Sequence, residues 1–581
     1  MIVPVEQKCA CKKGAVAFVF VPGIMGSRLY STDREDVVWD PAAGLHGELS
    51  GNFLRETLKR KQVLEDFNVE PEWYMEAGRM LKKQYYRYVK PVTKNVNEAV
   101  IQVARKFRTG ASLSDLFLKD AESRKVLLVN SDLSNGYERQ DDLLEVDAGS
   151  NDHFRYVTTV FPAEIEQKRK RGWGEVTWDS YGNFLHYLDK ELSQTLKWQE
   201  GFHGVEFGTF CAGYNWMLSN EVSGKRIKQK VTQFRQEMAK QAEVSESDVQ
   251  VIMITHSMGG LAARSAHLQG AEIDYMIHGA MPTNGSAATY RNAHCGYDGI
   301  AAPILGKNAA EVSAVLAFCQ GGLELLPNHL YQTIQPDYKW LKLVDRHKKE
   351  HSLIDAYPRE KIYDFYKTTS QWYSLFSDEL ISVGVEKIPR NIELVKKNYM
   401  RRIVAAGRFW SVLGGKFHND TTMFYSENSE MPSYDVCIWL ERGGCSGNYS
   451  SWEIISNDNH KWFFAAGNKE VVNKEEEKNY QAVKKASLRS SYWAGRESIT
   501  GKIPGISLIK LLPPWAGGDG TVHKGSGRDV RSENGSLISI GLQTEEGHQA
   551  FFLDHQVSKE ITSRIQEIMQ ETYKSKCQVA L

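Results

Sequence analysis

The chain has 581 residues, of which 41% are hydrophobic and 25% are charged, and these fractions are close to those of ordinary globular proteins. The composition excludes a disordered chain, and the length exceeds the roughly 250–300 residues at which a single hydrophobic core stops growing. Lys plus Arg and Asp plus Glu both number 72, so bulk charge gives no attraction to nucleic acid, and we expect no nucleic-acid partner.

The first residues, MIVPVEQKCACKKG, contain no apolar run of signal-peptide length. No other stretch approaches the roughly 18 apolar residues of a membrane-spanning helix. We therefore expect a protein made in the cytoplasm without a signal peptide. The eight cysteines are sparse for this length and indicate no disulfide framework. Neither Cys9 with Cys11 nor Cys437 with Cys445 has the C-x-x-C spacing of zinc sites, and we expect no metal and no cofactor.

The first element in chain order is the apolar run Gly14 to Val21, GAVAFVFV, which ends in Pro-Gly. A short β-branched and aromatic run of this kind predicts a buried strand that leads into a tight loop. After it the pattern loosens into aromatic helical stretches and loops rich in Asn, Asp, Ser and Gly. We assign residues 14–45 to the first part of an α/β core and residues 46–150 to an insertion over it.

Strands and helices then alternate. Gly204–Ala212 is a predicted strand, Glu221–Ala242 an amphipathic helix, Val249–Thr255 a second strand and Met258–Gln269 a second helix. This order is typical of a doubly wound, mostly parallel sheet with helices on both faces. Residues 151–305 are therefore assigned to the core.

The alternation stops in residues 306–400, which are rich in aromatic residues and are predicted to be a mainly helical cap or lid. Residues 401–416 are predicted to return to the core with a strand at Arg402–Ala406. Residues 417–505, rich in Asn, Ser and Gly, predict a second insertion, and residues 506–575 predict the last part of the core.

The segment VIMITHSMGGLAA, residues 251–263, places Ser257 between an apolar strand and a helix. This is the layout of a nucleophile elbow, whose sharp turn needs small residues two before and two after the serine. Thr255 stands where the usual G-x-S-x-G pattern has its first glycine. Because the helix N-terminus points its N–H groups at the reacting carbonyl, we predict Ser257 as nucleophile and the Met258 N–H as an oxyanion donor. The alternative is a plain glycine-assisted turn.

An elbow needs an acid and a histidine, which α/β-hydrolases present in the order Ser, acid, His. The predicted strand Ile506–Leu512 leads into PPWAGGDGTV, whose acidic residue, Asp519, is the predicted acid. His548 follows a predicted last strand at Ser536–Leu542 and is the predicted base, with Asp519 holding its tautomer. His555 competes with His548, but we place it at the start of the terminal helix.

The second oxyanion donor of this fold comes from the loop after an early strand. The segment VPGIMGS, residues 21–27, fits this role because its glycines let the backbone approach a substrate. Ile24 is the predicted N–H donor, and Met25 is the alternate. We expect His256 to pack or to contact substrate, because adjacent residues on a turn point apart. The aromatic cap favours an apolar substrate.

Taken together, these motifs resemble the lecithin:cholesterol acyltransferase-like lipases, an α/β-hydrolase family, and among them the bacterial phospholipase effectors delivered by type VI secretion. The elbow THSMGG and the ending of His548 followed by the helix Ile561–Met569 are similar to that family. Further matching segments, in chain order, are FVPGIMGSRL (20–29), GYNW (213–216, with Asn for the family's Asp), GAMPTNGS (279–286), LELLP (323–327) and GDGTV (518–522).

The resemblance implies a lipolytic serine hydrolase of the phospholipase A or lysophospholipase type, or one that transfers the acyl group to an acceptor other than water. It implies a phospholipid membrane surface as substrate, an immunity protein and a secretion-apparatus partner. The expected lack of a signal peptide suits an antibacterial type VI effector that acts in the periplasm or envelope of a target cell. Two alternatives are an acyltransferase or deacylase of other lipid-like esters and a non-catalytic binding module on a degenerate hydrolase fold.

Overall fold

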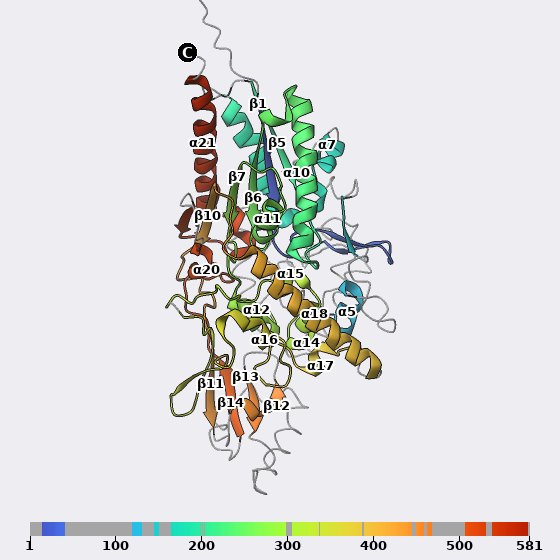
Figure 1. Cartoon of the computed structure of the whole chain (residues 1–581), viewed down its shortest axis with the longest axis vertical. Helices are drawn as coiled ribbons and strands as arrows, with labels where there is room; N and C mark the ends of the chain where they lie inside the picture. The colour runs from blue at the N-terminus through green and yellow to red at the C-terminus, as the bar shows by residue number, and fades with distance from the viewer. Residues whose placement is uncertain are drawn as a thin grey trace, which may run out of the picture.

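The molecule is elongated, with a sheet flanked by helices at one end, a second sheet at the other end and further helices between them (Figure 1). A third, smaller sheet has the strand order β3-β2-β4. The structure is a computed structural model. It describes residues 14–40, 119–129, 144–149, 164–197, 199, 202, 204–297, 305–335, 337–385, 389–443, 449–457, 462–466, 506–529 and 537–578.

The central sheet has six strands in the order β15-β10-β7-β6-β1-β5. All five neighbouring pairs in it run parallel. Its strands are β1 (Gly14–Val21), β5 (Val205–Cys211), β6 (Val249–His256), β7 (Tyr275–Gly279), β10 (Thr421–Ser426) and β15 (Ile538–Leu542).

The side chains of strand β1 are buried on both faces of the central sheet. All eight of its residues are buried. Val19 belongs to the same hydrophobic cluster as Ile227, whereas Phe20 belongs to a second cluster with Phe184 and Ile561. Alternate side chains therefore serve opposite faces, which is why the strand is apolar throughout.

Helices cover both faces of the sheet, so the chain has an α/β fold. The helices α10 (Asn220–Ala242) and α11 (Gly259–Leu268) cover one face. The helices α8 (Trp178–His186) and α21 (His555–Gln578) supply the cluster on the other face. The predicted strand-helix-strand-helix order around β5, α10, β6 and α11 is confirmed.

The strand predicted at Arg402–Ala406 is wrong, because these residues lie inside the helix α18 (Pro389–Leu413). The Ile403-Val404 pair is typical of a strand, but the apolar positions over the longer stretch recur every three or four residues. They form one buried stripe of Tyr399, Ile403, Ala406, Trp410 and Leu413. The core strand that follows is β10, which the sequence had placed within the second insertion.

A second sheet of six strands has the order β12-β13-β14-β11-β8-β9. The predicted strand at residues 506–512 exists as β14, but it pairs antiparallel with β11 and β13 rather than with the central sheet. A short apolar run identifies a strand but not its partners. The strands are β8 (Leu341–Val344), β9 (Glu350–Ser352), β11 (Cys437–Gly443), β12 (Glu453–Asn457), β13 (Trp462–Ala466) and β14 (Ile506–Leu511).

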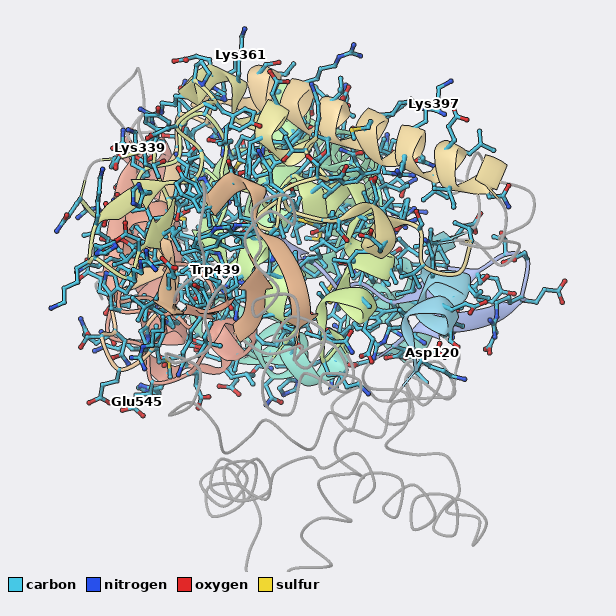
Figure 2. The ribbon with its side chains drawn as sticks, turned by 90° about the horizontal axis from the view of Figure 1, so that it is seen from below. Asp120, Lys339, Lys361, Lys397, Trp439 and Glu545 are labelled. Atoms are coloured by element: carbon cyan, nitrogen blue, oxygen red, sulfur yellow. The ribbon has the colours of Figure 1, made fainter. Side chains whose placement is uncertain are left out.

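The predicted cap, residues 306–400, has mainly helical regular structure in its described part, and it also supplies the short strands β8 and β9 to the second sheet. Its helices lie between the two sheets (Figure 1). Besides the first part of α18, its helices are α14 (Ala309–Leu316), α15 (Gln320–Leu323), α16 (Ile362–Tyr366) and α17 (Asp378–Ile381), and α12 (Ala287–Cys295) precedes it in the chain. Its aromatic residues Trp340, Phe365 and Phe376 are buried and belong to the same hydrophobic cluster as one face of the central sheet. In Figure 2, Lys397 of α18 stands at the outer edge, whereas Trp439 of β11 lies well inside the outline.

Most of the insertion predicted at residues 46–150 lies outside the described residues. Its described part includes α5 (Ala121–Leu128), where the ammonium of Lys125 donates to the carbonyl oxygens of Ile381 and Val383, each at 2.8 Å. The smaller elements are β2 (Leu29–Ser31), β3 (Asp36–Trp39), β4 (Leu144–Val146), α7 (Ile165–Lys170), α9 (Ser193–Lys197) and α20 (Lys524–Arg528). Within the described ranges, no helix is long and apolar enough to cross a membrane.

Candidate active site

Ser257 lies at the sharp turn between β6, which ends at His256, and α11, which begins at Gly259. Its φ angle is 50°, in the left-handed region that non-glycine residues seldom adopt. The serine N–H donates to the carbonyl oxygen of Gly279 on β7 at 2.9 Å, and this bond holds the strained turn. A serine in this backbone state between a strand and a helix is the geometry of a nucleophile elbow.

Two glycines let the loop after β1 pack against the elbow. A Cβ atom on Gly259 would lie 2.3 Å from the carbonyl oxygen of Pro22, which no side chain can tolerate. A Cβ atom on Gly23 would lie 3.1 Å from the Cβ of Ser257. The close approach of these two backbone segments brings the predicted oxyanion loop beside the predicted nucleophile.

Thr255, which replaces the first glycine of the usual elbow pattern, has a specific partner. It lies opposite His278 of β7 in the parallel register. Its hydroxyl oxygen lies 2.7 Å from the Nδ1 atom of His278, and both side chains are buried. The larger side chain is thus accommodated by a hydrogen bond across the sheet.

The structure brings Ser257, His548 and Asp519 together, although they come from segments far apart in the chain. The Nε2 atom of His548 lies 2.8 Å from the Oγ of Ser257. Its Nδ1 atom lies 2.8 Å from the Oδ2 of Asp519. A hydroxyl that faces one imidazole nitrogen, with a carboxylate on the other, is the arrangement that activates a serine for attack on an acyl carbon.

Asp519 is buried and held from several sides. Its Oδ1 accepts hydrogen bonds from the N–H groups of Thr521, at 2.9 Å, and Val522, at 2.7 Å. Burial raises the pKa of Asp519, but the charge and hydrogen bond of His548 and these two backbone bonds outweigh burial and leave the pKa below 3.8. An ionised carboxylate can only accept, so the Nδ1 of His548 carries the proton, and in the neutral ring Nε2 accepts from Ser257.

His555 does not reach this cluster. It is exposed at the first position of α21, whereas His548 opens the short helical turn η12 (His548–Leu553). Asp554, which lies between these two histidines, was not predicted from the sequence to have a role in the site. One of its carboxylate oxygens accepts from the N–H of Gln556 at 2.8 Å, and the other accepts from the N–H of Glu545 at 2.7 Å. Asp554 therefore caps α21 and fixes the loop that carries His548.

The loop after β1 is a tight turn with free amides. The N–H of Gly26 donates to the carbonyl oxygen of Gly23 at 3.0 Å, and Met25 has a φ angle of 61°. Among the described residues, the amides of Ile24, Met25 and Met258 have no hydrogen-bond acceptor. The N–H groups of Ile24 and Met258 are the oxyanion donors predicted from the sequence, and that of Met25 is the predicted alternate.

The segment GAMPTNGS, residues 279–286, supports the acid loop and the helix α20 that follows it. The hydroxyl of Ser286, just before α12, donates to the carbonyl oxygen of Thr521 at 2.8 Å. The hydroxyl of Ser526 donates to the carbonyl oxygen of Gly285, also at 2.8 Å. In the GYNW turn, the Asn215 amide donates to the carbonyl oxygen of Leu144 at 2.8 Å, so Asn215 has a structural role there.

Across the part of the chain that the structure describes, no group of three His, Cys, Asp or Glu side chains is placed to hold a metal ion. The described cysteines are buried and form no disulfide with one another, namely Cys211, Cys295, Cys319 and Cys437.

These features define an α/β protein with a Ser-His-Asp arrangement at the carboxyl end of a parallel sheet, in which Ser257 and Asp519 are buried and His548 is partly exposed. No protein-family model matches the sequence, and no curated protein matches it. Among solved structures, the chain is similar to a chain of "The crystal structure of Tle4-Tli4 complex", with a TM-score of 0.64 and 20% identity. The match covers 96% of this chain and 99% of that chain, so the two share one fold over nearly their whole lengths.

Proposed function

We propose that this protein is a lipolytic serine hydrolase with an α/β-hydrolase fold that cleaves acyl esters of phospholipids, as a phospholipase A or lysophospholipase does. The observation that carries the proposal is the hydrogen-bonded row of Asp519, His548 and Ser257. The Nδ1 of His548 lies 2.8 Å from the Oδ2 of Asp519, and its Nε2 lies 2.8 Å from the Oγ of Ser257. The positive φ of Ser257 at the end of β6 supports the same reading, because it matches a nucleophile elbow.

In the proposed mechanism, the Oγ of Ser257 attacks the ester carbonyl carbon while Nε2 of His548 takes the hydroxyl proton. The N–H groups of Ile24 and Met258 stabilise the oxyanion that forms. His548 then gives its proton to the leaving glycerol oxygen, and an acyl-serine remains. Water then attacks the acyl carbon while His548 takes its proton. His548 passes this proton to the Oγ of Ser257 as the acyl–oxygen bond breaks, which releases the fatty acid and the free serine.

We further propose that the protein acts as an antibacterial type VI secretion effector at the envelope or periplasm of a target cell. Two observations support this. The ordered motifs resemble phospholipase effectors of that system, and the fold is shared with a chain of the Tle4-Tli4 complex. That neighbour is a complex of two proteins, which supports an immunity protein as partner here. A membrane surface and the secretion apparatus are the other partners in this proposal.

The test pairs two assays on the wild type and on Ser257→Ala. The first is labelling by a fluorophosphonate, which reacts only with an activated serine. The second is release of free fatty acid from phospholipid vesicles, with and without an added alcohol acceptor. We expect the wild type to be positive in both assays and Ser257→Ala in neither. The variant Ser265→Ala, in the neighbouring helix α11, is the matched control and should behave as the wild type.

Each other outcome has a distinct meaning. Labelling without fatty-acid release would keep Ser257 as the nucleophile and remove phospholipid as the substrate. Acyl esters of the added alcohol in place of free fatty acid would identify an acyltransferase. A wild type that takes no label would favour a binding module, and labelling that survives Ser257→Ala would refute the proposed nucleophile.

A further inference from the structure

A row of hydrogen bonds connects the oxyanion loop to the backbone of His548 and passes behind the nucleophile. The N–H of Gly23 lies 3.1 Å from the hydroxyl oxygen of Tyr181. That oxygen lies 2.8 Å from the Nδ1 atom of His256. The Nε2 atom of His256 lies 2.9 Å from the backbone carbonyl oxygen of His548. These contacts join three segments that each supply part of the proposed site.

The direction of each hydrogen bond follows from the chemistry of its ends. A carbonyl oxygen can only accept, so the Nε2 of His256 carries the proton and donates to His548. The Nδ1 of the neutral ring then accepts from the Tyr181 hydroxyl, and the hydroxyl oxygen accepts from the N–H of Gly23. Burial, together with the nearby charge of His548, lowers the pKa of His256 to about 3, so this ring is neutral across the physiological range.

Two glycines make room for this row. A Cβ atom on Gly26 would lie 2.7 Å from the hydroxyl oxygen of Tyr181, and one on Gly23 would lie 3.0 Å from the Nδ1 of His256. Glycine at both positions lets the oxyanion loop come within hydrogen-bond distance of the two side chains. The glycines of the PGIMG segment thus serve the contact with Tyr181 and His256 as well as the turn itself.

Packing fixes both rings in place. Tyr181 and His256 are each only 1% exposed. The ring of Tyr181 lies 4.8 Å from that of Phe20 on β1, and the ring of His256 meets that of Phe552 edge-on at 5.6 Å. Rings held this firmly can transmit a fixed geometry to the groups they contact.

We propose that Tyr181 and His256 are positioning residues of the active site, which together hold the oxyanion loop and the backbone of His548 in register with Ser257. This inference rests on the proposed function. Because the N–H of Gly23 is occupied by Tyr181, the free amides of the turn begin at Ile24, which sets where an oxyanion can be held. The hydrogen bond from His256 to the carbonyl oxygen of His548 fixes the position of the His548 backbone, so that the Nε2 of His548 faces the hydroxyl of Ser257.

The test measures the rate of fluorophosphonate labelling, which needs an activated serine and an oxyanion site but no phospholipid. Tyr181→Phe keeps the ring and removes both hydrogen bonds of the hydroxyl, and we expect labelling to slow by roughly 10- to 100-fold. The matched control is Tyr187→Phe, which removes one hydroxyl contact, with Thr562 at 2.7 Å, from the helical turn that follows α8. We expect this control to keep the wild-type rate.

Two substitutions of His256 separate positioning from packing. His256→Leu fills the space but donates nothing to His548, and we expect a loss of labelling similar to that of Tyr181→Phe. His256→Gln places an amide nitrogen near the position of Nε2, so it should recover part of the rate. Because the two residues act as one link, the double variant of Tyr181→Phe with His256→Leu should be little slower than either single variant.

Thermal unfolding of every variant gives the structural comparison, and rates are measured well below the lowest melting temperature. Tyr181→Phe labelling within about twofold of the wild type, a Gln variant no faster than the Leu variant, or a double variant whose loss is the product of the single losses would each overturn the positioning role. These outcomes are distinct from failure of the proposed function, in which the wild type itself takes no label and both proposals fall.

Discussion

The exchange of Asp519 for asparagine tests how the acid controls the tautomer of His548. In the structure, Oδ1 accepts from the backbone N–H groups of Thr521 and Val522, while Oδ2 accepts from His548. An asparagine keeps the first two bonds by placing its carbonyl oxygen at Oδ1. Its amide nitrogen, a donor, then faces the Nδ1 of His548, which must present a lone pair.

The proton of His548 consequently moves to Nε2, which can no longer accept the proton of Ser257. The loss of the correct tautomer in a Ser-His-Asp arrangement costs about 10⁴-fold in rate. That corresponds to about 5.4 kcal/mol of transition-state stabilisation, and we expect this loss in fluorophosphonate labelling and in fatty-acid release. Because asparagine fits the same hydrogen-bonded loop, we expect the free energy of unfolding to change by no more than about 1–2 kcal/mol.

A nearby carboxylate gives the control. Asp529, in the same chain segment, accepts from the side-chain amide of Asn284 at 2.6 Å and lies outside the row. Asp529→Asn should label at close to the wild-type rate. If Asp519→Asn labels within tenfold of the wild type while it folds normally, Asp519 does not set the tautomer and the reasoning is refuted.

Two further predictions concern the elbow and the buried histidines. In Gly259→Ala, the added Cβ would lie 2.3 Å from the carbonyl oxygen of Pro22, so the loop after β1 must move. We expect fluorophosphonate labelling to be slower and the free energy of unfolding, measured in urea, to fall by about 1–3 kcal/mol. Burial, as the largest cause, lowers the pKa of both His256 and His278 from 6.5 to about 3. Between pH 6.5 and pH 3 these histidines bind protons in the unfolded chain but not in the folded chain. Their contribution to the free energy of unfolding is therefore complete above pH 6.5 and is lost as the pH falls toward 3, by up to about 1.4 kcal/mol per pH unit for each histidine.

The first of these predictions has a control close to α11, and the second is tested by a substitution of His278. The control is Gly270→Ala, just after α11, where the nearest atom to an added Cβ would be the Nζ of Lys228 at 3.6 Å. Because Gly270 has a positive φ angle, we expect this variant to lose stability but to keep the wild-type labelling rate. Labelling of Gly259→Ala at the wild-type rate would contradict the close approach of loop and elbow. For the histidines, His278→Asn should reduce the slope of unfolding free energy against pH in urea titrations between pH 6.5 and 4.5. An unchanged slope would show that His278 titrates normally in the folded chain.

The parts of the site that could be predicted from sequence are those with a local signal. The strand, the THSMGG turn and the helix around Ser257 are contiguous, so one window of sequence contains the whole elbow. Asp519 and His548 could be named because loops follow predicted strands in a fixed order along the chain. Nothing in their own segments indicated that these loops meet; the resemblance of the ordered motifs supplied that expectation.

The parts that could not be predicted depend on contacts between distant segments. Tyr181 lies in an aromatic stretch with no motif, and its partners Gly23 and His256 are far from it in the chain. The apolar strand at residues 506–511 gave no sign that it pairs in the second sheet. Helix α18 was predicted only in its first half, because the five residues Arg402–Ala406 contain the strand-like pair Ile403-Val404 and do not show the longer helical stripe.

The most direct test of the central claim is to detect the acyl group on Ser257. The protein is exposed briefly to phospholipid vesicles, quenched in acid and digested, and the peptide that contains Ser257 is examined by mass spectrometry. We expect a fraction of that peptide to be heavier by one fatty-acyl chain in the wild type, and none of it in Ser257→Ala. Steady release of fatty acid with the serine peptide unmodified in a quench fast enough to catch a single turnover would contradict a covalent mechanism through Ser257.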